Sequence, residues 1–450
     1  MTECIAQLGL SFYQPKPVAV TFDAPEISSD GGAILLRQVD DQLGLSAWFA
    51  AAIPEPRDAT RTTHDRREQV RPRLYQIALG YEDCNDADTL RSDPLLKTVC
   101  DRAPADPAGL SSQPTLSRFE NAADSGTIKR LLEQFEQRWV DALPADTEVV
   151  VLDIDTTDDL THGAQQLSFF HGYYDHHIYH PLLIFDGEGQ LVSAILRPGN
   201  THAARGAGAV LERLLRRIKG RFPACQIVVR GDAGFGIGRL LKRLDRLDAE
   251  LGGIAYLLGL AKNPALLRLA QPALAAAAQS FAAHHVKVRE FSTIGYGAQT
   301  WNRPHRVIVK AEHTAKGANP RFVVSNLDQF ESGLLYHAYC QRGQCENLIK
   351  DFKNALKADR LSCSRFVTNF LRLLEHAGAY RLMLALRRAA QALRSELGSQ
   401  QFDTIRLRLL KVAALVRQSV RRIVVQLPRA FPCAALFRSL ALYTSGAGVT

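Results

Sequence analysis

Apolar and polar positions change their spacing several times along the chain, and these changes divide it into regions of different structure. Residues 63–143 carry apolar positions at the spacing of amphipathic helices, with a proline-containing break at residues 104–114. At residue 147 the pattern becomes TEVVVLDIDTT, a β-branched, apolar run of the kind that buried strands use. A helical pattern returns at residues 326–356 and continues into the C-terminal region. We therefore expect helical regions on both sides of a core that contains a sheet.

The central part of the chain predicts a mixed sheet. Two apolar runs follow the first strand and are separated by Asp-Gly-Glu-Gly, which is typical of a hairpin turn. Strands and helices then alternate. Three strands in a meander followed by this alternation indicate an α/β fold with one mixed sheet. The predicted elements are strands at residues 147–157, 177–185, 190–196, 226–230 and 254–260, and helices at residues 204–221 and 237–247.

The same patterns predict how the chain is divided. Within a mostly helical N-terminal region we also expect short strands at residues 18–22 and 33–37. Three alternating runs (HVKVREFSTI, RPHRVIVKAEH and PRFVVSN) predict a β-rich insertion inside the α/β domain. The predicted regions are residues 1–143 (helical), 144–262 (first part of the core), 263–325 (insertion), 326–362 (a helix returning to the core) and 363–450 (basic and helical).

Composition narrows the class of protein. With 450 residues, 46% of them hydrophobic and 22% charged, the chain can build the cores of two or three globular domains. No apolar stretch approaches the ~20 residues that a membrane-spanning helix needs, and no signal peptide is visible at the N-terminus. The eight cysteines are scattered and form no CxxC pair, which argues against a zinc ribbon and a secreted disulfide framework. We expect a cytoplasmic protein with reduced thiols that does not contact membranes.

The positive charge of the chain is concentrated near its C-terminus. Residues 365–429 contain 13 basic and 3 acidic side chains, a local excess of +10, whereas the whole chain carries +9. Such an excess indicates binding to a polyanion, nucleic acid before a membrane surface. The alternative is an ordinary solvated helical face.

Acidic residues mark the ends of two predicted core strands. Asp153 and Asp155 alternate along the first strand and therefore point to the same face, and Asp232 follows the fourth strand. Because ligand sites form beyond strand ends in such sheets, these carboxylates can converge around a cation such as Mg²⁺ or Mn²⁺. The alternative is that they form turns; Asp158 and Asp159 are interpreted as loop acids.

A polar stripe follows on the helix predicted after residue 326. Tyr339, Arg342, Glu346 and Lys353 are spaced three, four and seven residues apart and share one face of an α-helix. The stripe offers a third carboxylate together with cationic and hydroxyl donors, which cleavage of a phosphodiester requires. An ordinary solvated face is again the alternative. An apolar stripe about 90° away predicts docking on a core; it consists of Cys345, Leu348, Ile349, Phe352 and Leu356.

The spacing Tyr-x2-Arg-x3-Glu-x6-Lys, together with the two strand-end aspartates, resembles the signature of bacterial insertion-sequence DDE transposases of the cut-and-paste type. The phrases LDIDTTDDLTHGAQQ, YHPLLIFD, LRPGNTHAARGA, VVRGDAGFG and YLLGLAKN are similar to one subfamily, the group 1 DDE transposases. These phrases cover residues 149–357, and SSQPTLSRFEN fits as well. The resemblance implies an RNase H-like catalytic domain interrupted by a β-rich insertion, and a DNA-end-binding role for residues 1–143.

The resemblance also implies the roles of single residues. The catalytic and metal-binding acids fall on Asp155, Asp232 and Glu346, while Asp153 stays a second candidate for the first position. Two Mg²⁺ ions, replaceable by Mn²⁺, are expected to support cleavage at the transposon ends and transfer of the freed strand into target DNA. The other residues of the polar stripe are expected to bind DNA phosphates near the scissile bond. They are Tyr339, Arg342 and Lys353.

The implied partners are double-stranded DNA, in the form of terminal inverted repeats and target DNA, and a second copy of the chain in a synaptic dimer. The resemblance also implies that the protein acts in the bacterial cytoplasm in association with the nucleoid. Related enzymes form hairpin ends, and Trp301 is a candidate for stacking on a base displaced in that process. Its alternative role is packing in a small β-domain core. Two other functions stay open: a structure-specific nuclease that cuts without joining, and a non-catalytic DNA-binding protein derived from a transposase.

Overall fold

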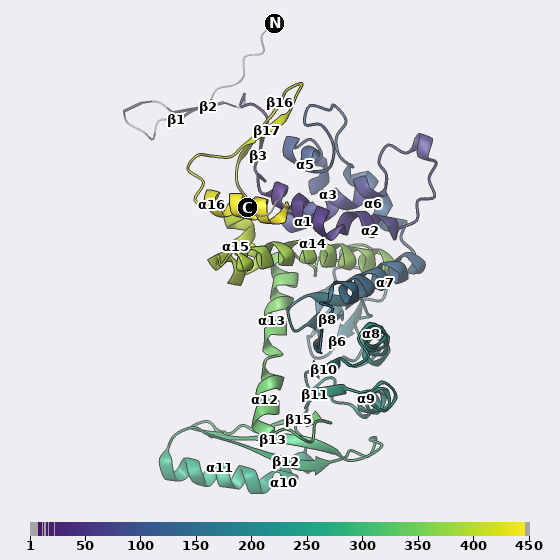
Figure 1. The fold of residues 1–450 in the computed structure, drawn as a ribbon, viewed down its shortest axis with the longest axis vertical. Coiled ribbons are helices and arrows are strands. Elements are labelled where there is room, and N and C mark those ends of the chain that lie inside the picture. Colours follow the sequence, from purple (N-terminus) through teal and green to yellow (C-terminus); the bar gives the residue numbers. More distant parts are fainter. Residues whose placement is uncertain (1–7, 11, 13–14, 17, 22, 446–450) are drawn as a thin grey trace. The chain divides into compact units, whose positions relative to one another are not determined.

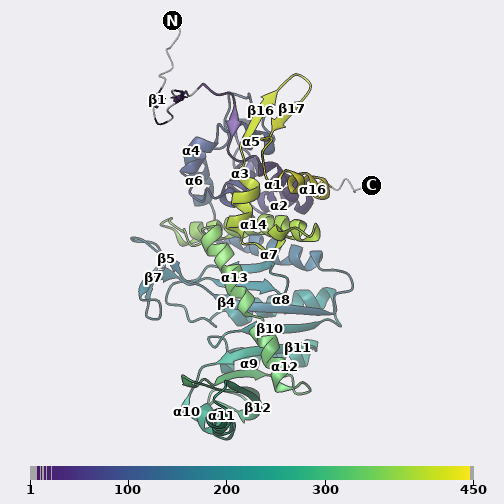
Figure 2. The ribbon, with the colours of Figure 1, turned by 90° about the vertical axis from the view of Figure 1, so that its left-hand side faces the viewer.

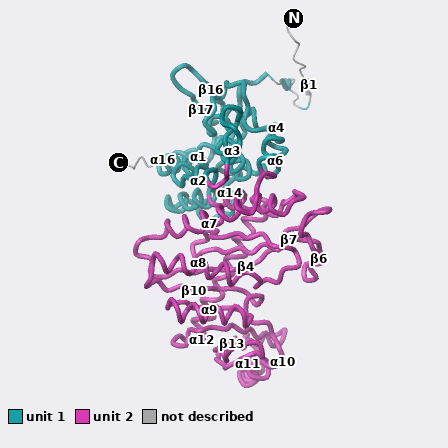
Figure 3. Tube along the Cα trace, turned by 90° about the vertical axis from the view of Figure 1, so that its right-hand side faces the viewer, with its two compact units in different colours: residues 1–51, 55–119, 382–450 teal, residues 52–54, 120–381 magenta. Residues whose placement is uncertain are grey.

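The computed structural model describes residues 8–445 apart from residues 11, 13–14, 17 and 22. The chain divides into two compact units, which Figure 3 colours separately. The first unit is made by residues 1–51, 55–119 and 382–450, and the second by residues 52–54 and 120–381. The predicted α/β core lies entirely within the second unit.

A mixed sheet of nine strands forms the centre of the second unit (Figure 1). Strand β4 pairs antiparallel with β8 on one side and parallel with β10 on the other, and β11 continues parallel to β10. In spatial order the strands are β12 (Val288–Tyr296), β13 (His305–Thr314), β15 (Arg321–Ser325), β11 (Ile254–Leu260), β10 (Gln226–Gly231), β4 (Val149–Thr156), β8 (Leu182–Asp186) and β9 (Leu191–Ile195), with β14 (Gly317–Ala318) on β13. The mixed α/β sheet predicted from the sequence is confirmed.

The two faces of this sheet are covered by different helices. Because side chains alternate along a strand, Val150, Leu152 and Ile154 enter one core, while Asp153 and Asp155 point to the opposite face. Apolar side chains of α7 (Ser125–Ala142), α8 (Ala207–Arg221) and α9 (Gly238–Leu251) complete the first core. Figure 2 shows α12 (Ser332–Cys340) and α13 (Gly343–Lys350) crossing the strands on the acidic face. The smaller elements of this unit are β5 (Asp159–Leu160), β6 (Phe169–His171) and β7 (His176–Tyr179), which form a sheet of their own.

Residues 263–325 differ from the insertion that the pattern predicted. All three β-rich runs form strands, β12, β13 and β15, as expected. However, β15 pairs antiparallel with β11, so these strands continue the central sheet. The beginning of the region is helical, as α10 (Pro264–Leu269) and α11 (Gln271–His284), because its alanine-rich sequence has a high helix propensity.

The first unit is mainly helical. The predicted strand at residues 33–37 is wrong, since these residues begin α1 (Ala33–Leu43); a short apolar run does not distinguish a strand from a buried helix. Residues 18–20 form β2, and Phe22 lies outside the described residues. The other helices of the N-terminal region are α2 (Leu45–Ala51), η1 (Ala59–Arg61), α3 (Arg66–Leu79), α4 (Asp86–Leu90), α5 (Pro94–Val99) and α6 (Gln113–Asn121), and β1 (Leu8–Leu10) pairs with β2.

The C-terminal region is not helical throughout, contrary to the prediction. Strands β16 (Ala414–Gln418) and β17 (Ile423–Gln426) form a hairpin that pairs with β3 (Ile27–Ser28). Its sequence, ALVRQSVRRIVVQ, is rich in β-branched residues, which favour strands over helices. The helices of the region are α14 (Phe366–Ala392), η3 (Glu396–Ser399), α15 (Phe402–Ile405), η4 (Arg406–Leu410) and α16 (Ala434–Thr444).

Two expectations from composition concern the whole chain. Within the described residues, no helix is both long and apolar enough to cross a membrane. The cysteines from Cys84 to Cys433 are all free, and Cys4 lies outside the described residues.

Candidate active site

The strand-end acids meet where β4 and β10 run side by side. Asp153 lies opposite Arg230 and Ile154 opposite Gly231 in this parallel pair, so Asp232 comes level with Asp155. The Asp232 carboxylate accepts a hydrogen bond of 2.9 Å from the amide of Gly234, which fixes the turn after the strand. The structure therefore brings Asp155 and Asp232 to the same edge of the sheet.

Asp155 lies in a strongly acidic environment. Its side chain is 14% exposed. Burial, and then the neighbouring Asp232 carboxylate, raise the pKa of Asp155 to about 6; Glu346 adds to this effect, and Arg342 opposes it. Asp155 and Asp232 thus lie in one acidic site, whereas Glu346 is exposed on α13 and adds to the negative charge felt by Asp155.

Helix α12 and the start of α13 bring two more predicted residues to this edge. Tyr339 reaches β11, where a Cβ atom placed on Gly259 would lie 2.7 Å from the Tyr339 hydroxyl oxygen. Arg342 points Nη1 toward the Asp155 carboxylate at 3.5 Å, and its guanidinium lies 5.7 Å from the centre of the Tyr339 ring. Burial lowers the pKa of Arg342, but Tyr339 and the carboxylates of Asp155 and Asp232 raise it overall above its ordinary value. Arg342 is therefore held in its charged form beside the acids.

Lys353 lies in an irregular part of the helical region and contacts the loop after β4. The signature residues do not share one continuous α-helix, because α12 ends at Cys340 and residues 351–355 form a π-helix, η2 (Asp351–Ala355). The constant angle of 100° per residue assumed from the sequence therefore fails for Lys353. Its Nζ lies 3.0 Å from the Asp158 carboxylate, in the loop after β4. In the apolar stripe, Cys345, Phe352 and Leu356 are buried as predicted.

Asp153 is engaged by a residue that the sequence analysis missed. Arg230 donates two hydrogen bonds of 2.6 Å to the two Asp153 oxygens, and both side chains are buried. A third bond of 2.8 Å runs from Arg230 to the carbonyl oxygen of Ala338, which immediately precedes Tyr339. This pair ties the sheet to α12. The available signal was an arginine inside an otherwise apolar strand, QIVVRG.

Asp158 and Asp159 differ in their surroundings. Asp158 lies in a loop, as predicted, whereas Asp159 begins β5 and is buried. Burial raises the pKa of Asp159 well above its ordinary value, although nearby Lys353 opposes the shift. Asp159 is therefore a buried acid at the start of β5, near Lys353, and not a loop residue as predicted.

Tyr174 is a second residue that the sequence analysis missed. It lies in the turn between β6 and β7, and burial together with Asp158, Asp155 and Asp232 raises its pKa to about 12. The turn therefore lies close enough to the acidic site for its carboxylates to affect Tyr174. In the sequence, Tyr174 belongs to the turn GYYD, which matches no specific functional motif and so gave little indication of this position.

The indole of Trp301 is held in an aromatic cluster. Its ring lies edge-on to Tyr296 and to His305, with centroid distances of 5.2 Å in both cases. A Cβ atom on Gly238 would lie 2.6 Å from the indole, so the ring also packs against the start of α9. This arrangement agrees with the packing alternative for Trp301.

The basic C-terminal residues are used in several ways. In the second unit, Arg381 is buried and donates to the carbonyl oxygen of Phe135. In the first unit, Lys411 pairs with Asp30 at 2.6 Å and Arg406 donates to the carbonyl oxygen of Ala78 at 2.9 Å. Exposed basic side chains of the β16–β17 hairpin are Arg417, Arg421 and Arg422. Only some of the basic side chains in this region are therefore exposed and available to bind a polyanion.

A metal site has the right kind of donors here but not a closed arrangement. Among the described residues, no group of three or more His, Cys, Asp or Glu side chains is placed as a set of metal ligands. Oxygen donors are nevertheless those that Mg²⁺ and Mn²⁺ prefer, and Asp155 and Asp232 lie at the same edge of the sheet, where a cation would compensate their charge. The donor chemistry therefore fits a divalent cation.

Comparison with known proteins identifies the family. A family model described as transposase DDE domain, group 1, matches residues 10–445. A solved structure described as a cryo-EM structure of the piggyBac transposase synaptic complex with hairpin DNA is 11% identical, with a TM-score of 0.43; the similarity covers 85% of this chain and 79% of that chain. No curated protein matches this chain. Because the family model covers nearly the whole chain, the chain belongs to the group 1 DDE transposase domain family and is a DNA transposase.

Proposed function

We propose that this DDE transposase cleaves DNA at the ends of its element with Asp155, Asp232 and Glu346, and then joins the freed strand to target DNA. The observation that carries the proposal is the parallel pairing of β4 with β10, which brings Asp155 level with Asp232 at one edge of the sheet, where burial and the neighbouring carboxylates raise the pKa of Asp155 to about 6. A surface acid that only forms a turn would not be buried among like charges. Such carboxylates can hold the divalent cations that assist phosphoryl transfer.

The first acid of the set is Asp155 rather than Asp153. Both side chains point to the same face of β4, but the Asp153 carboxylate is occupied by two hydrogen bonds from Arg230. Asp155 accepts a hydrogen bond of 2.8 Å from the backbone amide of Thr156 and faces Arg342 at 3.5 Å, but among the described residues no side chain binds both of its oxygens as Arg230 does for Asp153. Asp153 therefore acts through Arg230 on the position of α12, which carries Tyr339.

The fold supports the same centre. Five strands of the sheet have the order β9-β8-β4-β10-β11, with β4 antiparallel to β8 and parallel to β10 and β11. We propose that these strands are an RNase H-like core and that residues 263–325 are its insertion, although their strands extend the core sheet. With this assignment, Asp155 belongs to the first core strand and Asp232 follows the fourth.

Divalent cations belong to the chemistry of this family. We propose two Mg²⁺ ions, replaceable by Mn²⁺, held by Asp155, Asp232 and Glu346. When bound, they lower the pKa of a water or a DNA 3′-hydroxyl and stabilise the leaving oxygen. Tyr339, Arg342 and Lys353 have a separate role, because their donors position the phosphates that flank the scissile bond.

The partners follow from the reaction. Two transposon ends must be cut and joined, and each chain offers one acidic centre, so we propose a homodimer that holds two duplex ends and the target DNA. Residues 1–143 and the hairpin of β16 and β17 are proposed to contact the ends. Stacking of a displaced base on Trp301 requires that the indole leave its cluster with Tyr296 and His305.

The test uses duplexes that carry the terminal inverted repeats of the element, with Mg²⁺ or Mn²⁺. Asp155→Asn, Asp232→Asn and Glu346→Gln are each expected to abolish strand cleavage and to leave end binding within a few-fold of the unchanged protein. Loss of binding together with cleavage would contradict the catalytic assignment. Cleavage without joining of pre-cut ends would favour the nuclease alternative, and binding without any cleavage by the unchanged protein would favour the non-catalytic one.

A further inference from the structure

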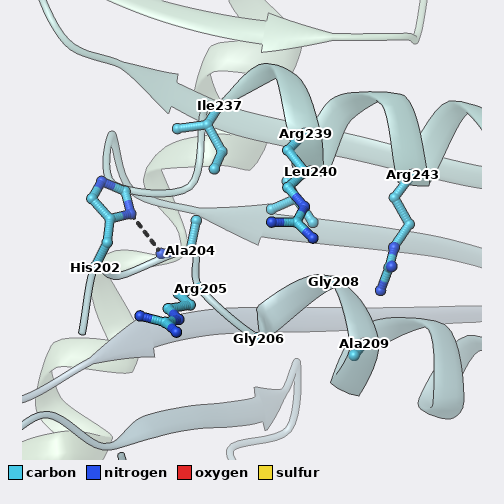
Figure 4. A pocket seen from close by; sticks show the side chains of 10 residues that line it. All are labelled: His202, Ala204, Arg205, Gly206, Gly208, Ala209, Ile237, Arg239, Leu240 and Arg243. Atoms are coloured by element: carbon cyan, nitrogen blue, oxygen red, sulfur yellow. Dashed lines mark hydrogen bonds between the residues drawn. The ribbon is translucent and has the colours of Figure 1, made fainter. Parts of the chain in front are cut away.

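A basic pocket lies beside the turn that carries Asp232. Its volume is about 570 Å³, and it is formed by the loop before α8 and the first turns of α8 and α9 (Figure 4). Arg239 and Arg243 extend from α9 toward the start of α8, and Arg205 lies on the preceding loop. No acidic residue is among the lining residues that the structure describes. Sequence analysis included this loop in the phrase LRPGNTHAARGA but gave it no role.

The arginines of this pocket contrast with other arginines on the same helices. Farther along α8 and α9, Arg216 pairs with Glu250 at 2.7 Å and Arg246 pairs with Glu212 at 2.9 Å. In the described part of the chain, neither Arg205 nor Arg239 has an acidic partner. Arg243 has only a contact of 3.7 Å to Glu212, which is already engaged by two other arginines. The positive charge is thus neutralised away from the pocket and left unneutralised in it.

A buried arginine next to the pocket gives an independent indication of an anion. Arg197 is 6% exposed and donates to the carbonyl oxygens of Ala203 and Arg205, at 2.7 Å and 2.9 Å. Its Nη2 has no hydrogen-bond partner among the described residues. This side chain lines an adjoining cavity of about 380 Å³, and Arg205 lines both cavities. Burying a charged donor without a partner is costly, so such a group points to a ligand that supplies the missing acceptor.

The backbone around the pocket favours the same ligand. Neither α8 nor α9 has a side chain that caps its N-terminus, so the positive ends of two helix dipoles face this region. A Cβ atom on Gly208 would lie 3.0 Å from Arg243, which shows how closely that side chain lies on the first turn of α8. The second acidic residue is near, since a Cβ atom on Gly234 would lie 2.9 Å from Ala203 and 3.1 Å from the Asp232 carboxylate.

We propose that Arg205, Arg239 and Arg243 bind a backbone phosphate of a DNA strand that passes beside the catalytic carboxylates, and that Arg197 faces the same strand from the adjoining cavity. This inference rests on the proposed function, because only DNA engaged at Asp232 leads a phosphodiester chain past this pocket. A cavity of this size accommodates a sugar–phosphate segment rather than a phosphate alone. The contact carries no base specificity, since arginines bound to phosphates position a strand without reading its sequence.

The experiment measures the affinity for a duplex of arbitrary sequence against salt concentration. The double variant R205A/R239A is expected to lose about 0.9 of the slope of log K against log salt for each phosphate contact removed. The matched control R216A/R246A removes two arginines from the same helices and is expected to keep the slope of the unchanged protein. Equal slopes for the two variants would overturn the proposal.

A second measurement guards against misfolded variants. At equal ionic strength, inorganic phosphate is expected to raise the thermal midpoint above that in chloride for the unchanged protein and for R216A/R246A, but not for R205A/R239A. The same midpoint shift in all three proteins would contradict the site. The charge-conserving variant R205K/R239K is expected to keep most of the salt slope.

Two reaction steps then identify the strand. Slower cleavage of terminal-repeat duplexes by R205A/R239A would assign the phosphate to the strand that is cut. Normal cleavage with slower joining of pre-cut ends would assign it to the target DNA. The two proposals fail in different ways. If the salt slopes of the variants differ as expected but the unchanged protein never cleaves DNA, only the proposed function is contradicted. If the unchanged protein cleaves DNA but both variants have the same salt slope, only the phosphate site is contradicted.

Discussion

The guanidinium of Arg230 and the carboxylate of Asp153 form two hydrogen bonds of 2.6 Å in the buried layer between the sheet and α12. Because Arg230 also donates to the carbonyl oxygen of Ala338, the pair connects β4 and β10 to the residue just before Tyr339. A bidentate pair has little freedom, so the C-terminal end of α12 is held in a defined position on the sheet. Asp153 thus contributes to the site without facing substrate.

Replacement of Asp153 by Ala should destabilise the protein. The change leaves the Arg230 charge buried without a partner, for which we expect a loss of about 3–5 kcal/mol in the free energy of unfolding. Denaturant unfolding of D153A measures this loss, and D155N is the control, expected to lose cleavage with little loss of stability. A stable D153A protein that no longer cleaves DNA would show that Asp153 is a ligand rather than a positioning residue.

Gly259 is expected to accept no larger residue. A Cβ atom there would lie 2.7 Å from the Tyr339 hydroxyl and 2.9 Å from the backbone nitrogen of Ala233. G259A must therefore displace α12 or the turn after Asp232. We expect G259A to cost about 1–3 kcal/mol of stability and to reduce cleavage strongly. The matched control is G295A on β12, where nothing lies within 4 Å of the added methyl group. Full activity of G259A would contradict the close contact with Tyr339.

The hairpin of β16 and β17 should supply the DNA contacts of the C-terminal region. The triple variant R417A/R421A/R422A is expected to reduce the salt slope of DNA binding by about 0.9 for each phosphate that an arginine no longer neutralises, with a stability change within about 0.5 kcal/mol. Arg408, which pairs with Glu396 at 2.6 Å, provides the control R408A with an unchanged slope. An unaltered slope in the triple variant would exclude the hairpin from the DNA path.

Acid should destabilise the second unit through His180. Burial, followed by Arg197 and His171, lowers the pKa of His180 to about 4, against the opposing effects of the Thr201 carbonyl and Asp158. Between about pH 6.5 and pH 4 the unfolded chain binds a proton that the folded chain does not, so stability falls as the pH is lowered through this range. Protonation of His180 in the unfolded chain lowers the free energy of unfolding by at most about 3 kcal/mol and has no effect above pH 6.5.

The variant H180Q tests this pH dependence. Its free energy of unfolding should fall less steeply than that of the unchanged protein between about pH 6.5 and pH 4, since glutamine does not titrate. H162Q, which changes an exposed histidine, is the control and should leave the slope unchanged. Parallel stability curves for H180Q and the unchanged protein would rule out His180 as the source of acid sensitivity.

The sequence by itself determined the class of fold and the chemical character of the site. The β-branched run at residues 147–157 and the strand–helix alternation after it depend on local periodicity, which the chain expresses without its neighbours. The alternation of Asp153 and Asp155 also follows from strand geometry alone. For the same reason, the buried stripe of Cys345, Phe352 and Leu356 could be predicted from helical spacing.

Only the tertiary structure decided which of these residues are free to act. Asp153 and Asp155 look equivalent in the sequence, and the difference between them arises from Arg230, which is 77 residues away in the chain from Asp153. Similarly, pairing of β15 with β11 joins the expected insertion to the central sheet, and the salt bridges of α8 and α9 leave Arg205 unpaired. Such contacts join distant segments, so their energies depend on packing and charge pairing that local periodicity does not encode.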